Sequence, residues 1–178
     1  FMKAFWLTIK EVLEVVAIAL VTVFIIRHFL VQPFLVSGAS MEPNFSDGNY
    51  LLIDEITYRF REPERGEVIV FRYPNNPATY FIKRIVGLPG ETVELKDGKI
   101  FANGEFIEED YLPDSPQSRD NLSTKLKADE YFVVGDNRSH SFDSRNWGPV
   151  NRDKIIGVAR LRVFPFNKLE YFQYAQEQ

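Results

Sequence analysis

The stretch YFIKRIVG, residues 80–87, carries the clearest structural signal in the chain. Its Val, Ile and Phe residues predict a buried β-strand. Because side chains alternate along a strand, Phe81, Lys83 and Ile85 are expected on the same face. A buried ammonium is costly, and loss of its proton is the usual relief. A neutral lysine is a general base, so this strand predicts a catalytic group as well as a core element.

Further short apolar runs, separated by turn residues, lie on both sides of this strand. Asp97-Gly98 and Asn103-Gly104 are two-residue hairpin signals. A polar loop is expected over residues 113–127. The other expected strands are Asn49–Ile53, Glu67–Arg72, Thr92–Leu95, Lys99–Ala102, Glu105–Ile107, Glu130–Val134 and Lys154–Phe164. The pattern predicts a mainly β fold, with an antiparallel β-sheet catalytic domain.

The N-terminus is interpreted as a single transmembrane helix over residues 12–31, and Pro33 is expected to end the helix because proline cannot continue it. Its charge-free part, residues 15–26, is short for a hydrocarbon core that takes about 20 residues to cross. Charged side chains at both ends can extend to the membrane–water interface, so residues 12–31 can still cross the bilayer. Residues 1–11 are then a short cytoplasmic segment, and residues 32–178 an extracytoplasmic domain with a small insert at about 96–127. A cleaved signal peptide and a buried soluble helix are the alternatives.

Composition excludes several classes of protein. The chain has 178 residues, no cysteine, two histidines and a formal net charge of −4. It therefore has no disulfide framework, cysteine nucleophile or Cys-based zinc site. With only two histidines in the sequence, a histidine-based metal centre is not expected. We expect no metal and no cofactor, and the acidic balance argues against a nucleic-acid partner.

A candidate nucleophile, Ser40, lies upstream in FLVSGASMEP, residues 34–43. Its small neighbours Gly38 and Ala39 leave room for a substrate carbonyl. Nearby backbone N–H groups can then bind the developing oxyanion. Taken alone, the same segment also fits an ordinary Ser/Gly turn.

A dense polar run, GDNRSHSFDSRNWGPV, spans residues 135–150 and directly follows an expected buried strand. Such a run indicates an ordered loop, because its side chains can bond the backbone and one another. Asp143 and Arg145 are suited to a charge pair. Ser141 can offer a hydroxyl to a neighbouring base.

Together these three segments resemble the type I signal peptidases, membrane-bound serine proteases that use a Ser/Lys dyad. The family pattern has a serine followed by Met-x-Pro, which matches residues 40–43. Its lysine is followed by arginine, hydrophobic residues and Gly-x-Pro-Gly, which matches residues 83–90. Its Gly-Asp-Asn-x-x-x-Ser-x-Asp-Ser-Arg box matches residues 135–145. All three occur in the family's order behind an N-terminal anchor.

The resemblance implies a role for each matching residue. Ser40 would be the nucleophile and Lys83 its general base. Ser141 would orient the Lys83 amine by a hydrogen bond, while Asp143 and Arg145 would hold the loop against the site. The backbone N–H of Ser40 would donate to the oxyanion. The residues expected to line the substrate pocket are Phe34, Val36, Met41 and Ile82.

The resemblance also implies the substrate and location. The substrates would be secreted preproteins with small residues at the first and third positions before the cut. The enzyme would lie in the plasma membrane as a single-pass protein, in contact with the lipid bilayer, with its catalytic domain on the outer face. One departure concerns the oxyanion hole: Gly38 stands where some relatives have a serine hydroxyl donor. Either Ser37 replaces that donor or backbone groups act alone.

Two rival functions remain from the residues themselves. A Ser-His-Asp hydrolase would use Ser40, His140 and Asp143. An inactive, membrane-anchored β-module would bind signal sequences without cutting them, although such a module has no need of a buried lysine near a serine. The Ser/Lys self-cleaving repressors share the dyad chemistry, but this chain has a membrane span in place of a DNA-binding domain.

Overall fold

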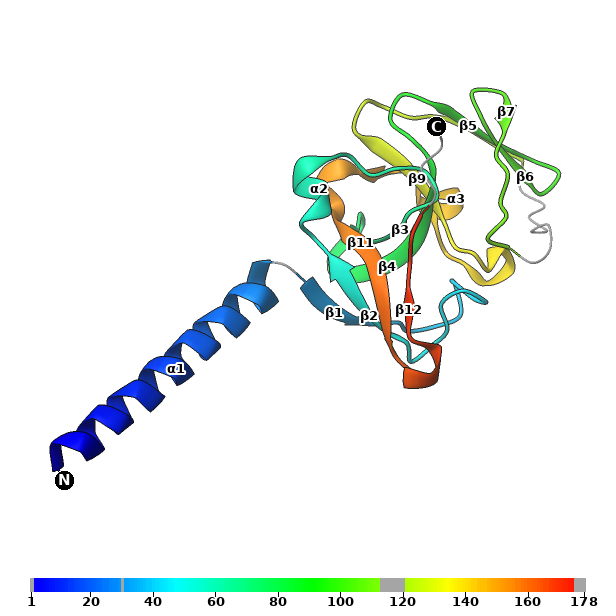
Figure 1. Cartoon of the computed structure of the whole chain (residues 1–178). Coiled ribbons are helices and arrows are strands. Elements are labelled where there is room, and N and C mark those ends of the chain that lie inside the picture. Colours follow the sequence, from blue (N-terminus) through cyan, green and yellow to red (C-terminus); the bar gives the residue numbers. More distant parts are fainter. Residues whose placement is uncertain (1, 30, 113–120, 175–178) are drawn as a thin grey trace.

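The chain folds into a β-rich domain that follows a long N-terminal helix, as the computed structural model shows (Figure 1). The structure describes residues 2–29, 31–112 and 121–174. Helix α1 (Met2–Phe29) projects away from the β-domain. The expected mainly antiparallel β fold behind an N-terminal helix is confirmed.

Strands of two sheets build the domain. The larger sheet has the order β1-β2-β11-β3-β4-β9-β10, with β12 added beside β11, and all its pairs are antiparallel. Its strands are β1 (Val31–Leu35), β2 (Tyr50–Asp54), β3 (Val68–Tyr73), β4 (Asn76–Gly87), β9 (Glu130–Val134), β10 (Val150–Asn151), β11 (Ile155–Phe164) and β12 (Glu170–Tyr171). The smaller sheet, in the order β7-β6-β5-β8, contains β5 (Thr92–Lys96), β6 (Lys99–Ala102), β7 (Glu105–Phe106) and β8 (Leu122–Lys125). Two short helices, α2 (Thr57–Phe60) and α3 (Ser144–Trp147), complete the domain together with 3₁₀ turns at Arg138–His140, Arg152–Lys154 and Phe166–Lys168.

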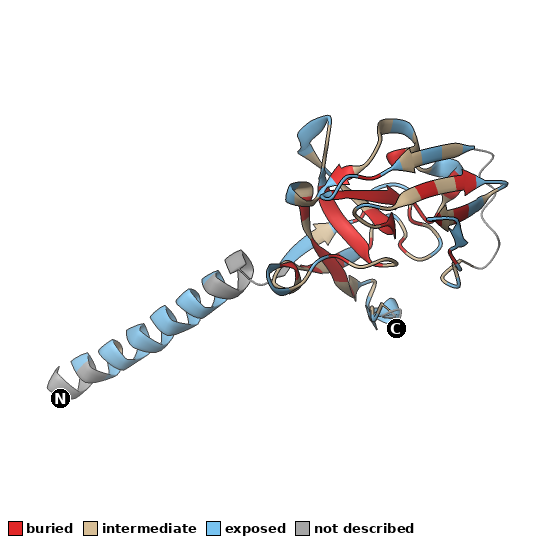
Figure 2. Ribbon diagram, turned by 90° about the horizontal axis from the view of Figure 1, so that it is seen from above, coloured by how far each residue is buried: buried red, intermediate tan, exposed pale blue. Residues whose placement is uncertain are grey.

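Apolar side chains cover both faces of the larger sheet. On β3, Ile69 and Phe71 pack into one buried cluster with Ile85 of β4. Val68 and Val70, which alternate with them, pack into a second cluster. A third cluster joins the smaller sheet to β9 through Phe132 and Val134. Buried residues are accordingly concentrated in the β-domain, whereas the described part of α1 is almost entirely exposed (Figure 2).

The expected strands are present, with ends that shift by a few residues. The two hairpin signals are confirmed: Asp97 and Asn103 have φ of 50° and 52°, and each precedes a glycine of positive φ. The expected loop over 113–127 is wrong in part, because Leu122–Lys125 forms β8 and pairs with β5. Residues 113–120 lie outside the described residues.

The N-terminal helix ends earlier than expected. It stops at Phe29, and Val31 already begins β1, where it pairs with Asp54. Pro33 lies inside β1 rather than marking the end of a helix, and an edge strand tolerates a proline because one side of its backbone needs no partner.

Apolar side chains cover the described part of α1 and are exposed. They are Trp6, Val12, Leu13, Val15, Val16, Ile18, Leu20, Val21, Val23 and Phe24. Within the described residues, no helix combines the length and apolar character that a membrane span requires.

Candidate active site

Ser40 and Lys83 meet although 43 positions separate them in the sequence. The Lys83 amine donates a hydrogen bond of 2.7 Å to Ser40 Oγ, and a second of 2.9 Å to the carbonyl of Ile82. Lys83 lies on β4, and Ser40 lies in the turn that follows β1. The expected pairing of these two side chains is therefore present, with a geometry from which a proton can pass directly from oxygen to nitrogen.

The surroundings of Lys83 favour its neutral form. The residue is only 4% exposed, and this burial lowers the pKa of Lys83 to about 8. The negative charges of Asp143 and Asp136 oppose the shift, while Arg145 adds to it. About one lysine in ten is then neutral at pH 7, compared with about one in 10³ for a free side chain.

The turn that carries Ser40 depends on Gly38. This glycine has φ of +89°, a conformation that other residues adopt only with strain. Its N–H donates a 2.7 Å hydrogen bond to the carboxylate of Asp47. Asp47 therefore fixes the peptide that lies two residues before Ser40, a contact that no pattern in the sequence predicted. Ser37 and Gly38 are both exposed.

The polar loop at residues 135–145 packs directly against the Ser40 turn. The N–H of Asn137 donates a 3.1 Å hydrogen bond to the carbonyl of Ser40. Gly135 lies so close that a Cβ placed on it would be 2.4 Å from that carbonyl oxygen and 2.2 Å from Ser141 Oγ. Only glycine therefore fits at position 135 without displacing the backbone of Ser40.

Asp143 and Arg145 form the expected charge pair and give the loop its shape. Arg145 Nε and Nη2 lie 2.8 and 2.9 Å from the two carboxylate oxygens of Asp143, whose second oxygen also accepts from the Gly135 N–H. Burial opposes ionisation of Asp143, but the Arg145 guanidinium outweighs it and holds the pKa of Asp143 below its usual value. Asp143 also caps α3.

Ser141 does not make the hydrogen bond that the resemblance implied. Its hydroxyl is buried and does not bond the Lys83 amine; it lies beside Asp143, where, against the opposing effect of burial and together with Arg145, it lowers the pKa of that carboxyl. The Lys83 amine is instead bonded to Ser40 and to the carbonyl of Ile82. Ser141 Oγ lies against Gly135, so it packs beside the dyad without contacting the amine through a hydrogen bond.

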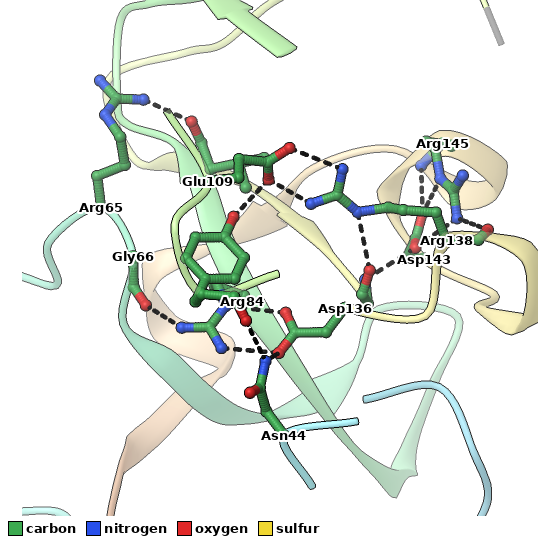
Figure 3. A network of polar contacts seen from close by, with 12 residues as sticks. Asn44, Arg65, Gly66, Arg84, Glu109, Asp136, Arg138, Asp143 and Arg145 are labelled. Carbon is green, nitrogen blue, oxygen red and sulfur yellow. Dashed lines mark hydrogen bonds and ion pairs between the residues drawn. The ribbon is translucent and has the colours of Figure 1, made fainter. Parts of the chain in front are cut away.

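Asp136 joins all three motif segments (Figure 3). Its carboxylate accepts hydrogen bonds of 2.8 and 2.7 Å from Arg84, the residue after Lys83. It also accepts a 2.8 Å hydrogen bond from the side chain of Asn44, four residues after Ser40. The lysine strand, the serine turn and the polar loop are thus tied at one buried carboxylate. This role of Asp136 could not be predicted from the sequence, because no local pattern pairs residues so far apart.

A second missed group comes from the segment after β7. Glu109 forms an ion pair with Arg138 and accepts from the Tyr111 hydroxyl. Arg138 Nε in turn donates to the carbonyl of Gly135 at 2.9 Å, and the Tyr111 ring lies 3.8 Å from the Arg84 guanidinium carbon. Glu109 and Arg138 therefore extend the network that is centred on Asp136 (Figure 3).

A cavity of about 310 Å³ opens beside the dyad. Its walls include Ser40 and Lys83 together with the expected Phe34, Val36 and Ile82. The expectation for Met41 is wrong: it is fully buried in the core beside Phe45 and Leu51 and does not line the cavity. In this turn the Met41 side chain points into the core, while the Ser40 side chain faces the cavity.

His140 does not complete a Ser-His-Asp triad in this arrangement. It is exposed on the cavity wall, and its ring Nδ1 lies 3.3 Å from Asn137 Oδ1. Both carboxylate oxygens of Asp143 are engaged by Arg145. Within the described residues, no hydrogen bond joins His140 to Ser40 or Asp143.

Comparison with known proteins agrees with this geometry. The sequence model of the family described as signal peptidase, peptidase S26, matches residues 9–164. This chain belongs to the signal peptidase I family. Its members are serine peptidases that remove signal peptides, so the expected activity class is confirmed.

Individual relatives cover most of the chain. Signal peptidase I T of Bacillus subtilis is 36% identical over 166 residues, which cover 88% of this chain and 86% of that protein. Signal peptidase I of Leptolyngbya laminosa is 37% identical over 168 residues, covering 90% of this chain and 82% of that protein. The crystal structure of a signal peptidase I from Enterococcus faecalis aligns with a TM-score of 0.50 at 33% identity, over 55% of this chain and 97% of that one.

Proposed function

We propose that this signal peptidase cuts preproteins with Ser40 as nucleophile and Lys83 as general base. The observation that carries the proposal is the 2.7 Å hydrogen bond from the buried Lys83 amine to Ser40 Oγ. A serine hydroxyl is a weak nucleophile until a base takes its proton, and a lysine serves as that base only when it is neutral. Burial of Lys83 supplies that condition.

Two half-reactions follow from this pair. Ser40 Oγ attacks the scissile carbonyl carbon while its proton moves to Lys83 Nζ. The tetrahedral intermediate collapses as that proton passes from Lys83 to the leaving amine nitrogen, which leaves an ester between Ser40 and the signal peptide. Water then attacks the ester, giving its proton to Lys83, and Ser40 Oγ recovers a proton as the signal peptide departs with a free carboxylate.

The remaining site residues position this pair. The Ser40 N–H is the proposed donor to the oxyanion. Gly38 gives the turn its shape, and its own N–H is already bonded to Asp47, while Ser37 precedes it on the exposed side. Asp143 and Arg145 hold the loop that supports Ser40 from behind. Ser141, packed against Gly135, fills the space beside the dyad.

The cavity suits small apolar side chains. Phe34, Val36 and Ile82 form part of an apolar wall directly beside Ser40. A cavity of about 310 Å³ has little room for two large side chains next to the scissile bond. We therefore propose preproteins with small residues at the first and third positions before the cut as substrates.

Cleavage of a preprotein with an Ala-x-Ala site, in detergent, tests the dyad. We expect wild type to cut after the second alanine, and folded Ser40→Ala and Lys83→Ala to lose activity by at least 10³-fold. His140→Ala is the matched control, because it changes the same cavity wall without touching the dyad. Near-normal activity of Lys83→Ala, or a loss in His140→Ala as large as that in Ser40→Ala, would overturn the assignment.

We also propose that residues 12–31 anchor the enzyme in the plasma membrane, with residues 1–11 in the cytoplasm and the β-domain on the outer face. The exposed apolar surface of α1 and the membrane-anchored character of the family support this. The proposed span includes residues 25–31, whose side chains the structure does not describe.

Alkaline carbonate extraction of membranes tests the anchor. We expect the full chain to stay in the membrane pellet and a variant with Ile18→Lys and Val21→Lys to be released, because charges in a lipid-facing helix are costly. Release of the wild type would refute the anchor. Protease digestion of the β-domain in intact cells or in inverted vesicles then reports the side on which it lies.

A further inference from the structure

The chain returns across the domain after β11, beyond the stretch that matches the family. The family match ends at residue 164, where β11 also ends. The chain then turns and comes back as residues 170–174, which we call the C-terminal strap. The strap begins with β12, which pairs with Leu161 and Arg162 of β11 (Figure 1). Further along, the Phe172 N–H donates to the Arg160 carbonyl at 2.8 Å, and the Tyr174 hydroxyl to the Ala159 carbonyl at 2.7 Å.

The strap packs against the end of the Ser40 turn. The ring of Phe172 lies 4.7 Å from the ring of Phe45, centroid to centroid, and Phe45 is 1% exposed. Phe45 closes the turn, because its N–H donates a 2.9 Å hydrogen bond to the carbonyl of Met41, the neighbour of Ser40. Displacement of the Phe45 ring therefore acts on the backbone next to the nucleophile.

Arg162 binds the strap and the Ser40 turn with one guanidinium. It forms an ion pair with Glu170, and its charge lies over the Phe172 ring at 5.5 Å. Its Nη1 donates a 2.7 Å hydrogen bond to the carbonyl of Asn44. Its side chain is 10% exposed, so water competes little for these contacts.

Contacts continue from this point to the lysine strand. The Asn44 side chain donates to Asp136, and Asp136 accepts from Arg84, which adjoins Lys83 (Figure 3). Residue 44 is therefore held on one side by Arg162 and on the other by Asp136. Among the described residues, no strand pairs with the turn between Ser40 and Phe45, so contacts of this kind, together with the Asn137 N–H on the Ser40 carbonyl, hold it in place.

We propose that Phe172 and Glu170 of the strap are positioning residues that act on Ser40 through Phe45 and Arg162. They hold the turn so that Ser40 Oγ stays within hydrogen-bond distance of Lys83 Nζ. Small displacements of a catalytic group, about 1 Å, cost up to about 10²-fold in rate. The proposal rests on the catalytic roles proposed above for Ser40 and Lys83.

Phe172→Ala in the full chain, compared with Phe166→Ala, tests the strap. Both variants remove one phenyl ring from the same C-terminal segment. Phe166 is 81% exposed and its ring contact is with Phe164, outside the Ser40 turn. With the Ala-x-Ala preprotein, well below the melting temperature of each variant, we expect roughly tenfold lower kcat for Phe172→Ala. KM should stay within twofold, Phe166→Ala should match wild type, and Phe172→Tyr should recover most of the loss.

A lowered melting temperature with unchanged kcat in Phe172→Ala would overturn the proposal, because the strap would then only stabilise the fold. If Phe172→Ala fails to fold, Glu170→Gln decides: it breaks the ion pair with Arg162 and leaves the ring contacts in place. A smaller drop in kcat is expected for it, and an unchanged kcat would equally refute the strap's role. Ser40→Ala and Lys83→Ala are measured alongside. If these two retain activity, the proposed dyad itself fails; if they are inactive and the strap variants normal, only the strap proposal fails.

Discussion

The guanidinium of Arg84, the residue after Lys83, donates two hydrogen bonds of 2.8 and 2.7 Å to the carboxylate of Asp136. Both side chains are buried, at 6% and 0% exposure. Removal of one partner leaves the other as a buried charge without compensation, which is more damaging than the loss of a surface pair.

Asp136→Ala should therefore lower the free energy of unfolding by about 3–5 kcal/mol. Asp153→Ala provides the comparison, since the Asp153 side chain is 67% exposed and pairs with its neighbour Lys154 at 2.9 Å. Loss of that pair should cost no more than about 1 kcal/mol. Urea unfolding of both variants measures the difference. Equal losses in the free energy of unfolding would show that the buried pair stabilises the fold no more than the exposed pair does.

Gly135→Ala should abolish most of the activity. The new methyl group would overlap Ser141 Oγ and the Ser40 carbonyl oxygen, and the latter belongs to backbone that the Asn137 N–H holds in place. We expect kcat to fall at least 10²-fold as Ser40 is displaced.

Gly90→Ala is a useful control for Gly135→Ala. Gly90 has φ of +81° and open space around a Cβ position, so alanine there brings backbone strain of about 1–2 kcal/mol but no overlap. It should lower stability and keep wild-type kcat in the preprotein assay. Normal kcat in Gly135→Ala would show that the loop can retreat without moving the nucleophile.

Asp47→Ala should reduce kcat/KM roughly fivefold, because one hydrogen bond of about 1 kcal/mol no longer holds the Gly38 peptide. Asp47→Asn keeps an oxygen acceptor in the same place and should retain more activity. Steady-state cleavage of the preprotein by the two variants separates them. If both behave like wild type, the Asp47 contact does not position the turn.

Local patterns in the sequence predicted much of the fold. Alternating apolar residues identified β4 around Lys83, and Asp97-Gly98 and Asn103-Gly104 identified two hairpins, because these signals depend on neighbouring residues alone. β8 was missed because it is an edge strand of polar sequence, Leu122–Lys125, whose pattern resembles a loop. The end of α1 was misplaced because Pro33 also suits the edge strand β1.

The sequence likewise predicted some residues of the candidate site and not others. Ser40 and Lys83 were identified because motif order marks them, and their contact follows from the sheet. The roles of Asp47, Asp136 and Arg162 were not foreseen, because each depends on tertiary contacts that no short pattern encodes. Met41 was misassigned because the direction of a side chain in an irregular turn does not follow the alternation of a strand.

The pH dependence of kcat/KM tests Lys83 as the base most directly. Only neutral Lys83 accepts the Ser40 proton, so activity should rise tenfold per pH unit on the acid side and level off above the lysine pKa of about 8. The same midpoint should persist in His140→Ala. An acid limb centred near pH 6.5, the ordinary range of histidine, that disappears in His140→Ala would contradict the dyad and make histidine the base.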